Sequence, residues 1–100
     1  MSPPPPLLTE RLNQMLSKRD YPKTICPSEV ARSMSTSELR TLGIDTWRDL
    51  MPQLRNMAFE ARDRGEVEVL QRGEVVSIEI ENVRGPIRIR LMRSNDEANN

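Results

Sequence analysis

The fold of this chain is decided by the stretch RGPIRIRL at residues 84–91. In its second half Ile and Leu alternate with Arg, which is the two-residue period of a half-buried β-strand. The upstream stretch EVEV at residues 66–69 has the same alternation. We therefore predict that the two stretches pair as antiparallel strands. Between them we predict a turn at residues 72–74, a stretch with strand propensity at 75–80, and a return to the last strand.

Helical patterns occupy the first part of the chain. Leucines at helical spacing predict a first helix over residues 7–18, and a proline suited to a first helical position predicts a second over 27–34. Residues 35–38 read STSE, a capping-box pattern, which predicts a short helical turn that Gly43 ends.

A third main helix is predicted from about Thr46 to Gly65, with Pro52 in its first turn or at the junction with a single-turn preface. Its apolar residues fall on one side and are expected to face the core, with Trp47, Leu54 and Met57 largely buried. These residues are Trp47, Leu50, Leu54, Met57, Ala58 and Ala61.

Three helices followed by a hairpin predict an α+β winged helix, with one extra helical turn between the second and third helices. The predicted domain spans residues 7–93. Residues 1–6 form a proline-rich lead-in expected to stay outside any helix, and residues 94–100 form a polar tail expected to be disordered.

Composition narrows the class of function. Lys plus Arg equals Asp plus Glu at 15 each, so any basic patch must be local. The chain has no His and one Cys, which argues against a metal site, a cofactor, a small-molecule substrate and catalysis. Without a disulfide or a membrane-spanning run, it is expected to be intracellular, cytoplasmic or nuclear.

The strongest candidate for binding is the polar side of the third main helix. Arginines spaced by sevens form one row there, an arrangement suited to a helix lying in a DNA major groove. Two arginines of the wing, the connection between the paired strands, are suited to phosphate contacts. The expected contacts with double-stranded DNA are therefore Arg48, Arg55, Asn56, Arg62, Arg72 and Arg84.

A protein-interaction module is the alternative function. Phe59 lies on the same polar side of the helix, where an exposed ring would serve a protein interface. Val76 and Ile78 make the wing unusually apolar, so the wing could dock a partner or extend a sheet edge. The sequence alone does not identify a preferred DNA site, a protein partner or the oligomeric state.

Structural roles are expected for Arg88, Arg90 and Cys26. Arg88 and Arg90 are expected to pair across the strands with Glu66 and Glu68. Cys26 is expected to be a buried, unreactive thiol because no His is present to act as its base.

Three blocks of sequence go beyond generic pattern: KTICPSEVAR at 23–32, WRDLMP at 47–52 and RGPIRIR at 84–90. In this order they resemble a family of small winged-helix proteins filed as a domain of unknown function. The resemblance covers about residues 8–90 and implies the fold. It implies DNA binding only by analogy of shape, and this chain differs in a longer connection over 34–46 and a more apolar wing.

Overall fold

The computed structural model describes residues 3–92. Its helices are α1 (Pro6–Ser17), α2 (Pro27–Arg32), α3 (Thr36–Thr41) and α4 (Met51–Asp63), and its strands are β1 (Val67–Gln71), β2 (Glu74–Val75) and β3 (Arg88–Leu91). Two 3-10 turns, Trp47–Leu50 and Ile80–Asn82, complete the elements of the described range. The tail predicted at 94–100 lies outside the described residues.

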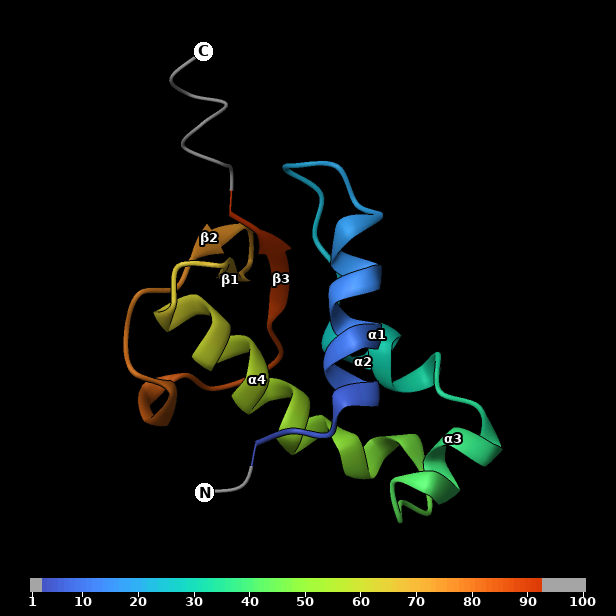
Figure 1. The fold of residues 1–100 in the computed structure, drawn as a ribbon. Coiled ribbons are helices and arrows are strands. Elements are labelled where there is room, and N and C mark those ends of the chain that lie inside the picture. Colours follow the sequence, from blue (N-terminus) through green and yellow to red (C-terminus); the bar gives the residue numbers. More distant parts are fainter. Residues whose placement is uncertain (1–2, 93–100) are drawn as a thin grey trace.

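The architecture is α+β, with the sheet at the C-terminal end of the described chain, as Figure 1 shows. The strands are antiparallel in the order β2-β1-β3, an arrangement compatible with a winged helix. The predicted strand pairing is confirmed, since Val67 lies opposite Leu91 and Val69 opposite Ile89. Helix α3 is the predicted extra turn.

A single apolar core joins α1, α2, α4 and the sheet. Leu54 and Ile89 are each 1 % exposed and pack with Leu12, Val30 and Met57, as the periodicities predicted. The prediction fails for Trp47, which packs against the core but is only partly buried. Trp47 begins the 3-10 turn before α4, and the guanidinium groups of Arg32 and Arg48 lie over its indole ring.

Several boundaries differ from their predictions for local reasons. Pro6 begins α1, because a first-turn residue needs no amide donor, and the amide of Leu8 donates to the carbonyl of Pro5 instead. Helix α2 ends at Arg32, before Met34. The third main helix has a 3-10 preface, and Pro52 lies in the first turn of α4.

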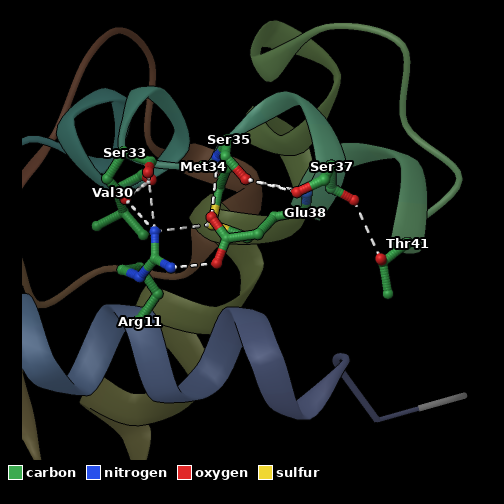
Figure 2. Close-up of polar contacts among 8 residues, drawn as sticks. All are labelled: Arg11, Val30, Ser33, Met34, Ser35, Ser37, Glu38 and Thr41. Atoms are coloured by element: carbon green, nitrogen blue, oxygen red, sulfur yellow. Dashed lines mark hydrogen bonds and ion pairs between the residues drawn. The ribbon is translucent and has the colours of Figure 1, made fainter.

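Helix α3 is fastened to α1 by the side chain of Arg11, as Figure 2 shows. The Arg11 guanidinium donates to the carbonyl of Ser33 at 2.9 Å and forms an ion pair with Glu38. Glu38 also accepts a hydrogen bond from the amide of Ser35 at 2.8 Å, and Ser35 Oγ accepts one from the amide of Glu38, so the predicted capping box is confirmed. The amide of Ser35 and then the Arg11 guanidinium lower the pKa of Glu38 below its ordinary value.

The wing departs furthest from expectation. The strand propensity noted over 75–80 is realised only at Val75, which pairs with β1 as part of Glu74–Val75. The amide of Val76 still donates to the carbonyl of Val69 at 2.7 Å. The chain then leaves the sheet and runs along α4 as residues 76–86, which we call the wing segment (Figure 1, orange). It turns inward because Val76, Ile80 and Val83 pack against the core.

Candidate functional site

The wing segment occupies the side of α4 that was expected to face DNA. Arg55 donates from Nη1 to the carbonyl of Gly85 at 2.9 Å and from Nη2 to the carbonyl of Val83 at 2.8 Å. Arg62 Nη1 donates to the carbonyl of Ile78 at 2.7 Å. Both guanidinium groups are therefore engaged by the wing, and donors that satisfy backbone carbonyls are not presented to bases in this arrangement. Their entry into a groove of DNA stays a prediction.

Phe59 lies between these two arginines and is 3 % exposed. The guanidinium carbons of Arg62 and Arg55 lie 4.7 Å and 5.7 Å from the centre of its ring. The prediction of an exposed Phe59 face for a protein partner is therefore wrong. The two arginines lie over the ring, which is part of the core.

The rest of the predicted row does not form a basic face. Arg48 is exposed, with its guanidinium 4.6 Å from the ring centre of Trp47, and Asn56 is exposed one turn into α4. The other exposed residues of α4 between positions 52 and 63 include Glu60 and Asp63. These carboxylates repel phosphate, so the free face of α4 suits DNA poorly.

The two wing arginines remain accessible. Arg72 is exposed in the β1–β2 turn with a φ of 53°, and its side chain makes no hydrogen bond to another residue of the range 3–92. Arg84 is exposed and donates weakly to the carbonyl of Glu81 at 3.3 Å. Ile78 is 54 % exposed, whereas Val76 is half-buried.

The cross-strand ion pairs are confirmed in one case only. Arg90 Nε lies 2.8 Å from Glu68 Oε1, and these residues are opposite each other in the register. Arg88 does not pair with Glu66, because its register partner is Leu70 and its guanidinium reaches Thr24 instead. The side chain of Arg88 is still about half exposed, at 52 %.

A groove lies where the end of the wing segment passes the first turns of α2 and α4. Its apolar half is a cavity of about 410 Å³, walled mainly by Pro27, Met51, Pro52, Pro86 and Ile87. It continues into a second cavity of about 690 Å³, with which it shares Cys26 and residues 85–87. We call the two cavities together the wing groove.

The second, polar half of the wing groove lies between β1, β2 and the return of the wing. Arg72, Arg84 and Arg88 line it together with Glu74. Gln71 fixes its wall, because Nε2 donates to the carbonyl of Arg84 at 2.6 Å and to that of Pro86 at 3.2 Å. Two arginines predicted to contact phosphate and one predicted to stabilise the sheet thus line the same cavity.

Sequence reasoning missed the apolar wall of this groove. Pro27 and Pro52 were recognised as first-turn residues, but their convergence with Pro86 in space is a product of the tertiary fold. The sequence did contain one indication of this wall: proline stands at two helix starts beside partly apolar neighbours. Proline is rigid and lacks an amide donor, so such positions leave an apolar surface.

Cys26 lines the wing groove and is only partly buried, so the expectation of a fully buried thiol is wrong. It precedes α2, where its amide donates to Glu29 Oε2 at 2.6 Å, and Ser28 Oγ donates to its sulfur at 3.0 Å. Within residues 3–92 no group of three or more His, Cys, Asp or Glu is placed to hold a metal ion. No helix of that range is long and apolar enough to cross a membrane.

Comparison with known proteins places the chain by its sequence. Residues 5–92 match the model of a family described as "Protein of unknown function (DUF3253)", so the predicted resemblance to a family of unknown function is confirmed. All three sequence blocks fall inside the matched range. A search of curated proteins finds no match.

Proposed function

The chain belongs to the DUF3253 family, and from the geometry of its surface we propose that it is a non-catalytic module that binds another protein through the wing groove. The observation that carries this proposal is the position of the wing segment. It engages Arg55 and Arg62, the side chains suited to base readout, and it forms one wall of an apolar groove.

The chemistry of the apolar half favours a protein ligand. Proline and aliphatic side chains offer contact area without hydrogen-bond donors, and a partner gains free energy there by burying apolar side chains. Met51 adds a side chain that adapts its shape to what binds. Phosphates and sugars gain little from such a wall.

The non-catalytic part of the proposal rests on the groups near the groove. Cys26 and Ser28 are the nucleophile types present there, and they contact each other at 3.0 Å. The sequence contains no His that could serve either as a general base.

Site-specific photocross-linking tests the proposal. A photoreactive amino acid placed at Pro52, in the groove, is expected to cross-link a protein in nuclease-treated extract of the source cells, whereas the same residue placed at Asn56, one turn further along α4, is not. The captured protein is then purified and its Kd for the chain measured. Equal cross-linking at both positions, or capture that depends on intact nucleic acid, would refute the proposal.

Duplex DNA remains a second candidate because Arg48, Arg72 and Arg84 are exposed. With few available cations we propose only weak binding in this case, with a log–log salt slope of roughly −3 to −4. Arg72→Ala and Arg84→Ala should each reduce the slope by about one unit. No binding to duplex DNA at low ionic strength would exclude this candidate, because electrostatic attraction is least screened there.

A further inference from the structure

We infer that the ligand of the wing groove is an acidic peptide segment of a partner protein that presents an apolar side chain between carboxylates. This inference rests on the proposed function and specifies the class of partner. It follows from two different surfaces that meet at Gly85–Ile87, one apolar and one cationic.

The apolar half is shaped to receive a side chain. Its walls come from three separate parts of the chain, with Pro27 starting α2, Pro52 in the first turn of α4, and Pro86 at the return of the wing. Proline has no amide donor and little conformational freedom, so such a wall loses little entropy when a ligand packs against it. An aliphatic or aromatic side chain is the group that this wall recognises.

The polar half carries an excess of positive charge. Three arginines line it against one carboxylate, that of Glu74, although the chain as a whole carries equal numbers of basic and acidic residues. Glu29 lies 3.8 Å from the guanidinium of Arg88 and offsets part of that charge. The local balance still favours an anionic ligand.

The arginines keep donors that a ligand can use. The side chain of Arg72 is unengaged within residues 3–92, and Arg84 donates to a carbonyl from Nη1 alone. Arg88 donates from Nε and Nη2 to Thr24, which orients its guanidinium beside the groove. Carboxylates accept paired hydrogen bonds from such planar groups.

A peptide fits the combined groove better than a nucleic acid does. A duplex backbone would place phosphates against the arginines but would leave the proline wall unmatched. A segment with an apolar residue next to Asp or Glu satisfies both halves at once, since the shared residues Gly85–Ile87 put them side by side.

Fluorescence anisotropy with labelled synthetic peptides tests the inference on the full chain. The probe has Leu-Phe at its centre between acidic flanks; one comparison peptide has lysine flanks and another replaces Leu-Phe with Ser-Gly. The acidic Leu-Phe peptide is expected to bind at least about tenfold more tightly than either comparison peptide. Equal affinity for the acidic and lysine-flanked peptides, or no binding of any peptide, would overturn the inference.

Substitutions then locate the binding. Pro52→Glu and the double variant Arg72→Glu/Arg84→Glu should each weaken the acidic peptide about tenfold or more, and the double variant should gain affinity for the lysine-flanked peptide. The matched controls are Asn56→Glu on α4 and Arg40→Glu on α3, both exposed and outside the groove. Circular dichroism verifies that each variant is folded.

The result separates this inference from the proposed function. If the protein captured at position 52 binds Arg72→Glu/Arg84→Glu as tightly as it binds the parent chain, the acidic class of partner is refuted while the protein-binding function stands. If cross-linking at position 52 captures no protein, the function itself fails, whatever the peptides do.

Discussion

The guanidinium of Arg62 meets the backbone carbonyl of Ile78 at 2.7 Å, across sixteen residues of chain. The same Nη1 lies 3.3 Å from the carbonyl of Val76. At the other end of the wing segment, Arg55 donates to the carbonyls of Val83 and Gly85. Two side chains of α4 thus fix the path of the wing by donating hydrogen bonds to its backbone carbonyls. The shape of the wing groove depends on this path.

Arg62→Ala should therefore destabilise the protein. Its side chain is only 14 % exposed, and its loss leaves two wing carbonyls without their charged donor. We expect a loss of about 1.5–3 kcal/mol in the free energy of unfolding, measured by urea denaturation. Arg40→Ala, at an exposed position of α3, should change it by about 0.5 kcal/mol or less. Equal effects of the two substitutions would show that the wing is not held this way.

Leu54→Ala tests the orientation of α4. Leu54 is 1 % exposed in the middle of the core, so the substitution removes buried methyl groups and leaves a cavity. The expected cost is about 2–5 kcal/mol in the free energy of unfolding. Asn56→Ala on the exposed side of the same helix is the control and should have little effect. A small effect of Leu54→Ala would mean that α4 is rotated from the orientation described.

Glu38 should make the free energy of unfolding depend on pH below its ordinary pKa of 4.5. The Ser35 amide and the Arg11 guanidinium lower its folded-state pKa below the ordinary 4.5, so the charged form is favoured in the folded protein. Its contribution is fully present above the unfolded pKa and is lost as pH falls through the lower, folded pKa. Glu38→Gln should therefore unfold at lower urea than the parent chain at pH 7.

The difference between the parent chain and Glu38→Gln should shrink when the urea midpoints are measured again well below pH 4.5. Carboxyl chemical shifts followed by NMR give the folded pKa of Glu38 directly. A gap between the two chains that widens on acidification would contradict the assigned direction of the shift.

Cys26 offers a test of its position as the residue that caps α2. Serine is preferred over alanine at such a position because its oxygen can accept a hydrogen bond from the first turn, and Cys26 is only partly buried. Cys26→Ser should therefore be more stable than Cys26→Ala by about 1 kcal/mol in urea denaturation. If Cys26→Ala is instead the more stable variant, the side chain at position 26 is buried, as the sequence suggested.

Periodicity and capping chemistry predicted the framework of this fold. The spacing of Leu54 and Met57 identified the buried side of α4, and the alternation around Val69 and Ile89 identified the paired strands. The pattern from Ser35 to Glu38 identified α3 through its own hydrogen bonds. These features depend on residues close together in the chain, so a short stretch of sequence is enough to predict them.

The candidate site was predictable only in part. Arg72 and Arg84 were recognised as accessible wing cations, but Arg55, Phe59 and Arg62 were expected on a free surface. The two arginines are engaged by the wing segment across fourteen to thirty residues of chain, and they in turn lie over Phe59. The apolar residues of the wing indicated the path of the wing segment, because apolar side chains are stabilised when they pack against another part of the molecule.

The wing's attachment to α4 also governs how the molecule behaves at high concentration. β2 spans only Glu74–Val75, and beyond it the carbonyls of Val76 and Ile78 accept hydrogen bonds from Arg62. An outer strand invites edge-to-edge stacking of copies when its backbone groups are open over a long, flat stretch. Here the edge is short and the valine- and isoleucine-rich stretch that follows has its carbonyls turned toward the molecule's own helix. We therefore expect Arg62 to hold this stretch away from intermolecular β-structure.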